Sequence, residues 1–309
     1  MNKLLAIAIC LGAAGALLAQ NQNFDNVTEK ILPVQGNVYM LVGAGGNTTL
    51  QVGKDGVLVV DTQYAALAPK IMAAIRTLSE MPIKYIINTH VHGDHTNGNG
   101  ALAKLGGGGA MPRIIANDHV LNRMTEKPAP GQAAVPDTDW PNDEYFTPSK
   151  DFFFNNEAVI VYHMPAAHTD GDSIVFFRRS DVVSTGDIFT PEHYPLIDLQ
   201  RGGTVQGIID ALNRILEITV PAKYQEGGTY VIPGHGRLCE EADVVEYRDM
   251  VTIIRDRIAD LIKKGRTLEQ VKAAKPTLDY DTQYGATTGI WTTDMFIEAI
   301  YKNLSGKKP

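Results

Sequence analysis

The chain has 309 residues, of which 44% are hydrophobic, and a net charge of −7 that results from 28 basic and 35 acidic residues. This length can bury the core of one large α/β domain or of two small ones. The acidic balance argues against a nucleic-acid partner and against a polybasic patch for membrane surfaces. No internal stretch of the sequence is long and apolar enough to span a bilayer.

The first 19 residues have the layout of a secretory signal peptide. Lys3 precedes an apolar run from Leu4 to Leu18, and Ala19 is a small residue suited to a cleavage point. The alternatives are a buried N-terminal helix and a membrane anchor, but the run is short for a membrane span and polar residues follow it directly. We therefore expect a secreted or periplasmic mature chain of residues 20–309, with no stable membrane insertion after cleavage.

Cleavage after residue 19 would leave Cys239 as the single cysteine of the mature chain. No intramolecular disulfide would then be possible, so an exported protein would depend on its core for stability. A lone cysteine can be a nucleophile, but Cys239 stands where a helix is predicted to start. We interpret it as a packing residue.

Strands and helices alternate through the first half of the chain. Apolar, β-branched runs between glycine-rich turns predict strands at 38–42, 48–53 and 56–61. Apolar residues at helical spacing then predict a helix over 65–80, and two more strands are expected at 83–90 and 112–118. This alternation predicts an α/β architecture with layers packed around a sheet.

Two segments of the first half carry no predicted helix or strand of their own. The glycine-rich stretches 42–47 and 105–112 fit neither phosphate-binding fingerprint, and we interpret both as turns. Residues 126–150 are rich in proline and acidic residues and are predicted to form a long irregular loop. Such loops are often functional or mobile, and a surface insertion without a role is the alternative.

The second half repeats this style. Strands are predicted at 158–165, 172–178, 181–187 and 229–236, and a helix is predicted at 205–218. A long helix then begins near Glu240, carries Lys263 and Lys264 near its end, and is closed by Gly265, which suits the helix dipole. A single domain over residues 20–309 is the simplest interpretation.

His90, His92, Asp94 and His95 form a dense group of ligand-type residues at the end of a predicted strand. Alternate residues of an extended chain face the same side, so the imidazoles of His90 and His92 can converge. Gly93 allows the chain to turn before Asp94 and His95. Three nitrogen donors and a carboxylate suit a borderline cation such as Zn²⁺. The alternative is a satisfied polar loop, which rarely contains four ligand-type residues in this order.

Three further ligand-type residues, His168, Asp187 and His235, stand in turns that follow other predicted strands. Loops at the ends of several strands are a common way for an α/β scaffold to assemble a site. Seven such groups can fill two four-coordinate metal sites if one carboxylate bridges the two ions.

With these residues in this order, the sequence resembles the metallo-β-lactamase superfamily. The signature His-x-His-x-Asp-His matches residues 90–95, and the later motifs match in order over roughly residues 37–235. The resemblance implies an α/β fold that is a four-layer αββα sandwich. It also implies a first metal on His90, His92 and His168, a second metal on Asp94, His95 and His235, and Asp187 as the bridge between them.

The resemblance says less about the substrate. Members that hydrolyse β-lactams commonly have Cys or Ser where Asp187 stands. A bridging Asp is more typical of glyoxalase II-like thioesterases, lactonases and other hydrolases of the superfamily. Asp187 therefore weakens the assignment of β-lactamase activity without excluding it.

The leading hypothesis is an exported hydrolase with two Zn²⁺ ions, in which a metal-bridging hydroxide opens an amide or ester-type bond. Asp94 is the candidate catalytic residue, because its carboxylate can orient the nucleophile or pass on its proton. Export favours a β-lactam or another cyclic amide as substrate, and a lactone or thioester is the alternative. Glutathione thioesters are disfavoured because they belong to the cytosol.

Two hypotheses of other classes are also open. Some relatives in the superfamily hold a single iron and oxidise persulfides, but the complete second ligand set of Asp94, His95 and His235 disfavours this reaction. A non-catalytic metal-binding or interaction protein would be expected to have lost ligands, and all seven positions are filled.

The remaining polar residues near these motifs suggest supporting roles. Candidates for lining the pocket of a small-molecule substrate, or else solvated loop residues, are His193, Tyr194 and Arg201. Asp61 ends a predicted strand and is expected to orient a metal ligand. His119 and His163 are interpreted as structural. The oligomeric state is left open.

Overall fold

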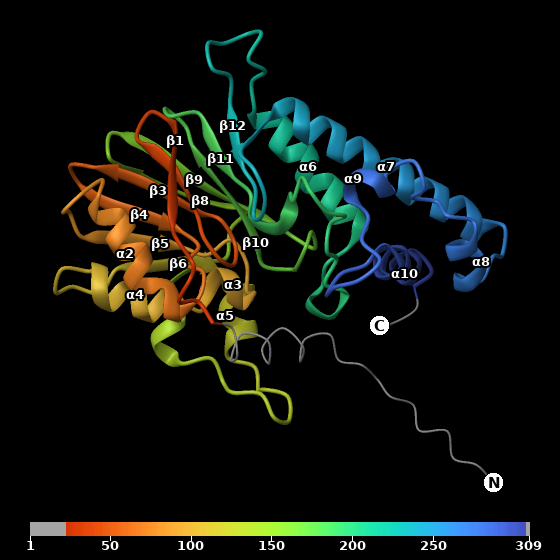
Figure 1. Ribbon diagram of the computed structural model, residues 1–309, viewed down its shortest axis with the longest axis horizontal. Coiled ribbons are helices and arrows are strands. Elements are labelled where there is room, and N and C mark those ends of the chain that lie inside the picture. The colour runs from red at the N-terminus through yellow and green to blue at the C-terminus, as the bar shows by residue number, and fades with distance from the viewer. Residues whose placement is uncertain (1–22, 307–309) are drawn as a thin grey trace.

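The computed structural model describes residues 23–306, and the predicted signal peptide at residues 1–19 lies outside the described residues. Two β-sheets face each other, and helices cover the outer face of each sheet (Figure 1). Among residues 23–306, no helix is both long enough and apolar enough to cross a membrane.

The first sheet has seven strands that lie side by side in the order of the sequence. The first four strands form antiparallel hairpins, and the remaining strands add in parallel. The strands are β1 (Lys30–Gln35), β2 (Val38–Val42), β3 (Thr48–Gly53), β4 (Gly56–Val60), β5 (Ile83–Ile87), β6 (Arg113–Asn117) and β7 (Asp143–Tyr145).

The second sheet has six strands in the order β13-β12-β11-β10-β9-β8. Its pairs are antiparallel except for β11 and β12, which are parallel. The strands are β8 (Ser149–Phe154), β9 (Glu157–Met164), β10 (Asp172–Phe177), β11 (Val182–Ser184), β12 (Tyr230–Ile232) and β13 (Cys239–Glu240).

The helices divide between the two outer faces. They are α2 (Ala68–Arg76), α3 (Gly93–Thr96), α4 (Asn99–Gly106), α5 (Asp118–Met124), α6 (Val205–Ile218), α7 (Glu241–Lys263), α8 (Leu268–Ala273), α9 (Asp281–Tyr284) and α10 (Thr293–Leu304). Apolar side chains of α2 and α4 pack on the first sheet, and those of α6, α7 and α10 form a core with the second sheet.

A third apolar core lies between the sheets and includes Val38 and Ile87 from one sheet and Val159 and Val175 from the other. The order of layers is therefore helix, sheet, sheet, helix. This confirms the α/β class and the four-layer αββα sandwich expected from the resemblance.

The two long helices of the second half agree with their predicted ranges, because each has its own local start signal. The Thr204 hydroxyl accepts a hydrogen bond from the Gly207 amide at the start of α6. At the start of α7, Glu240 and Asp243 form a reciprocal capping box, and Gly265 follows the helix with a φ of +72°.

The prediction of an irregular loop over residues 126–150 is wrong in its second half. Residues 125–136 have no helix or strand, but a short 3₁₀ helix, β7 and the start of β8 at Ser149 follow within the predicted loop. The strand β7 has only three residues and exists because it pairs in parallel with β6, so that Glu144 lies opposite Ala116. This pairing is a tertiary contact that local periodicity does not encode.

The carboxyl ends of β4, β5, β11 and β12 lie at the same edge of the sandwich. Within each sheet this follows from the pairing, because β5 runs parallel to β4 and β12 runs parallel to β11. The two sheets meet at this edge, since His95 Nε2, in the helix after β5, lies 3.2 Å from Asp187 Oδ1, after β11. Loops that leave this edge can bring residues of both sheets together. The predicted ligands stand in these loops.

Candidate metal centre

All seven predicted ligands converge at this edge of the sandwich. They form two groups in which the ligand atoms lie within 4.8 Å of one another. Group A consists of His90, His92, His168 and Asp187, and group B consists of Asp94, His95 and His235. The residues come from the loop after β5, from α3, from the β9–β10 loop, and from the turns after β11 and β12.

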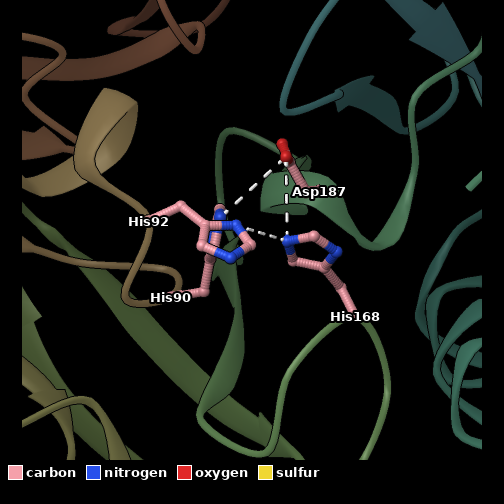
Figure 2. Close-up of side chains that lie close together, drawn as sticks. All are labelled: His90, His92, His168 and Asp187. Atoms are coloured by element: carbon pink, nitrogen blue, oxygen red, sulfur yellow. Dashed lines mark hydrogen bonds and ion pairs between the residues drawn. The ribbon is translucent and has the colours of Figure 1, made fainter. Parts of the chain in front are cut away.

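Group A is formed by three imidazoles arranged around one carboxylate oxygen (Figure 2). His90 Nε2 and His168 Nε2 each lie 3.9 Å from Asp187 Oδ2, and His92 Nδ1 lies 2.8 Å from His168 Nε2. Within residues 23–306, the buried Nε2 atom of His90 has no hydrogen-bond partner. An orphaned buried nitrogen is costly unless something binds it, and a cation held by these donors would do so.

Group B lies on the other side of the same carboxylate. Asp187 Oδ1 is 3.2 Å from His95 Nε2 and 3.5 Å from His235 Nε2. Asp94 Oδ2 is 3.2 Å from His235 Nε2 and 3.7 Å from His95 Nε2. One oxygen of Asp187 therefore faces group A and the other faces group B, as a bridging carboxylate requires.

The second nitrogen of four of these histidines is held by a hydrogen bond. His90 Nδ1 lies 3.0 Å from the Thr89 hydroxyl, and His168 Nδ1 lies 2.7 Å from the Leu196 carbonyl oxygen. His92 Nε2 lies 3.0 Å from Asp198 Oδ2, and His95 Nδ1 lies 2.7 Å from Asp61 Oδ2. Such bonds fix the ring orientation and the tautomer of a metal-binding histidine.

Asp61 has the orienting position expected for it. Besides contacting His95, its carboxylate accepts hydrogen bonds from the amide and the hydroxyl of Thr89, at 2.8 and 2.7 Å. Asp61 thereby links the residue next to His90 with a ligand of group B.

The glycine-rich loop after β2 packs directly on group B. The Gly46 amide donates to the Asp94 carbonyl oxygen at 3.1 Å, and the Asn47 amide donates to the Gly234 carbonyl oxygen at 2.7 Å. The side chain of Asn47 donates to the carbonyl oxygens of Pro233 and Gly236. The turn predicted at 42–47 therefore also braces the loop that carries His235.

The electrostatics of the cluster suit a cation. Burial lowers the pKa of His90 well below its usual value, and burial together with the nearby His92 lowers the pKa of His168 to about 4. Burial alone would raise the pKa of Asp94, but the charge of His95 and the hydrogen bond with His235 lower it to about 2. Neutral imidazoles and ionised carboxylates are the protonation states that metal binding needs.

His95 has the opposite tendency. Burial would lower its pKa, but the carboxylates of Asp187, Asp61 and Asp94 outweigh burial and raise it well above the usual value. Three carboxylates therefore surround one ring and create a field that favours positive charge at group B.

The three residues predicted to line the substrate pocket have different environments. Tyr194 requires a correction, because it is 2% exposed, stacks on Phe296 and places its hydroxyl 2.9 Å from Asp281 Oδ1. His193 is exposed beside this buried tyrosine, so its pocket role stays a prediction. Arg201 forms an ion pair of 2.7 Å with Asp198, the residue that contacts His92.

The other interpreted residues agree with structural roles. His119 and His163 stack on each other with ring centroids 5.7 Å apart and are not among the ligand groups of residues 23–306. Cys239 is 3% exposed within the core of the second sheet. In the proline-rich loop, Val135 and Trp140 belong to the same small apolar cluster as Val91, which stands between His90 and His92.

Asp198 and Asn47 are contacts of the metal centre that sequence reasoning did not identify. Both act on residues more than 100 positions away, since Asp198 contacts His92 and Asn47 contacts the His235 loop. Their own sequence surroundings carry no ligand motif that could have identified them.

Comparisons with known proteins identify the family and the fold. The model of the metallo-beta-lactamase superfamily matches residues 41–273. None of the curated proteins matches the chain significantly. Among solved structures, the stereoselective inverting sec-alkylsulfatase Pisa1 from Pseudomonas sp. has 17% identity and a TM-score of 0.66 over 94% of this chain and 54% of its own. The chain thus spans about half the length of that protein.

Two further solved structures are similar over most of their own length. The metallo-beta-lactamase from Pontibacter korlensis has 14% identity and a TM-score of 0.58, over 73% of this chain and 99% of that chain. The structure of TMB-1 has 15% identity and a TM-score of 0.55, over 73% of this chain and 97% of that chain. At these identities the structural likeness shows the fold alone. Because the family model covers most of the chain and the fold agrees, the chain belongs to the metallo-β-lactamase superfamily.

Proposed function

We propose that the protein is a hydrolase that holds two Zn²⁺ ions, one in each group, and opens amide or ester-type bonds. The observation that carries this proposal is the position of Asp187, whose two carboxylate oxygens face group A and group B. Metal ions held there would lower the pKa of water from about 15.7 towards about 7 and polarise a carbonyl oxygen.

The residues of the chain supply binding and proton handling. Burial lowers the pKa of His90 and of His168, so these two imidazoles of group A are neutral at pH 7 and can offer a lone pair to a cation. Asp94 is ionised at neutral pH, and its side chain is 27% exposed. Its carboxylate can therefore orient a water molecule and accept a proton, which is the catalytic role we propose for it.

A β-lactam or another cyclic amide is the first substrate that we propose. The similarity of the fold to a metallo-β-lactamase over nearly all of its length supports testing this class. The shared carboxylate of Asp187 favours a lactone or a thioester as the second candidate. A sulfate ester belongs in the same panel because an alkylsulfatase has a similar fold.

We also propose that residues 1–19 direct export and are removed, so that the mature chain acts in the periplasm or outside the cell on a small molecule. The Lys3 start, the apolar run and Ala19 support this proposal. Cell fractionation with N-terminal sequencing tests it, and an intact N-terminus on a cytosolic protein would contradict it.

The deciding experiment counts the metals of the purified mature chain and measures hydrolysis of nitrocefin, a lactone, a thioester and a secondary alkyl sulfate. Two zinc ions per chain and turnover of one class are expected, with loss of turnover on chelation or in His92→Ala. If the chain carried its full complement of metal ions and hydrolysed no member of the panel, the proposal would be overturned. A single iron with persulfide oxidation would assign the other reaction class.

A further inference from the structure

Asp198 lies at the centre of a hydrogen-bond system behind His92. Its Oδ2 atom is 3.0 Å from His92 Nε2 and 2.7 Å from Arg201 Nη1. Its Oδ1 atom accepts the backbone amides of Gln200 and Arg201, both at 3.1 Å. The side chain is only 12% exposed, so these partners hold the carboxylate in one place.

The same short segment also holds His168. We call residues 196–203 the clamp segment. Within it, the Leu196 carbonyl oxygen contacts His168 Nδ1 at 2.7 Å, and the Asp198 amide donates to the His168 carbonyl oxygen at 3.0 Å. A Cβ on Gly203 would lie 2.2 Å from that carbonyl oxygen, so the segment approaches His168 more closely than a side chain would allow. Two ligands of group A, 76 positions apart, are therefore held by one segment.

The orientation of His92 differs from that of its neighbours in group A. His90 and His168 face Asp187 with Nε2, whereas His92 has Nδ1 near His168 and Nε2 on Asp198. An imidazole whose Nε2 donates to a carboxylate carries its proton there, which leaves the lone pair on Nδ1. A ring without that partner can turn over or protonate the other nitrogen.

We infer that Asp198 is a positioning residue that presents His92 to the group A metal through Nδ1, and that Arg201 holds this carboxylate instead of contacting substrate. The inference rests on the proposed metal centre. Carboxylate partners of metal-binding histidines fix the ring and raise its basicity, and their loss typically weakens metal binding by about 10- to 100-fold.

The test compares Asp198→Asn with the unchanged mature chain by competition of each bound Zn²⁺ against a chelator, and by the visible spectrum of the Co²⁺-loaded protein. One metal equivalent should bind about 10- to 100-fold more weakly. The affinity for the other equivalent should stay within a few-fold of that of the unchanged chain, and the visible absorption bands of the bound Co²⁺ should shift. The matched control is Asp279→Asn, which breaks an exposed 2.7 Å pair with Arg257. The control should change neither readout.

Failure of the inference and failure of the proposed function give different results. If the unchanged chain binds no metal, the metal centre itself is overturned. If the chain binds two ions and Asp198→Asn retains both affinities and the cobalt spectrum, only the positioning role is overturned.

Arg201→Gln provides a second, milder variant in case Asp198→Asn does not fold, as judged by circular dichroism. It should weaken the same metal equivalent by a smaller factor and leave KM unchanged. A raised KM with unchanged metal affinity would make Arg201 a substrate contact and overturn its role in the inference.

Discussion

Gly46 lies against the imidazole ring of His95, so that a Cβ built on Gly46 would be 2.3 Å from ring atom Cε1. The ring of His95 therefore occupies the place that any side chain at residue 46 would need. Group B is shaped by this close approach of the backbone as well as by its three ligands.

Gly46→Ala is expected to weaken metal binding at group B, because the added methyl group must displace the ring of His95. The second metal equivalent should bind at least about tenfold more weakly, and overpacking should cost about 1–3 kcal/mol of stability. Chelator competition and denaturant unfolding measure the two effects. Gly109→Ala is the control for the metal readout, since a Cβ there would meet nothing within 4 Å. Unlike Gly46, Gly109 has a positive φ of 90°, so any loss of stability in the control comes from its backbone. Equal metal affinities in both variants would contradict the prediction.

Asp187→Asn is expected to weaken both metal equivalents together, because each group loses one charged oxygen. Loss of a hydrogen-bond partner of a metal ligand already weakens metal binding by about 10- to 100-fold. Loss of a ligand that both ions share should therefore weaken the binding of each ion by at least as much. Asp94→Asn is the comparison and should weaken only one equivalent, since Asp94 belongs to group B. If Asp187→Asn affected one ion alone, the carboxylate would not bridge.

Tyr194→Phe is expected to reduce stability without changing KM. The lost hydroxyl leaves Asp281 Oδ1 and the Thr277 carbonyl oxygen without their donor, which should cost about 1–2 kcal/mol in denaturant unfolding. Tyr224→Phe is the control, because Tyr224 is 75% exposed and should change nothing measurable. An increase in KM at unchanged stability would return Tyr194 to the substrate pocket.

Asp243→Asn is expected to destabilise the start of α7 in a pH-dependent way. Burial would raise the pKa of Asp243, but hydrogen bonds from Arg237 and from the Glu240 amide lower it below 3.8. Stabilisation by a carboxylate with a lowered pKa is complete above its unfolded value and is lost as the pH falls through the folded pKa.

The variant should therefore lose about 1 kcal/mol near pH 7, as for other helix caps. Its difference from the unchanged chain should shrink below about pH 4. Urea unfolding at several pH values measures this difference. Asp256→Asn, an exposed carboxylate of the same helix, is the control and should show a small effect. A difference that grew as the pH fell would refute the assignment.

Cys239 is expected to resist alkylation in the native protein. Burial raises the pKa of its thiol to about 12, so that almost no thiolate exists at pH 8. Mass spectrometry should find Cys239 unmodified by iodoacetamide in buffer and fully modified in denaturant. Rapid labelling of the native chain would indicate an accessible thiol and contradict a packing role.

Elements whose signals are local could be predicted from the sequence. The spacing of apolar residues and the Thr204 cap are sufficient for α6, and the alternation of apolar runs with turns is sufficient for β2 and β3. The strand β7 could not be predicted, because three residues become a strand only when β6 lies beside them. The same reason explains why the second half of the predicted 126–150 loop was wrong.

The chemistry of the metal centre was also present in the sequence, since ligand type and order are properties of the chain. The positions of the atoms depended on packing. Only the meeting of β5, β11 and β12 at one edge turns the two oxygens of Asp187 towards different histidines. Only the clamp segment brings Asp198 to His92, and only the core around Phe296 buries Tyr194. These contacts join residues 92 to 106 positions apart, and no local pattern in the chain specifies a distance of that kind.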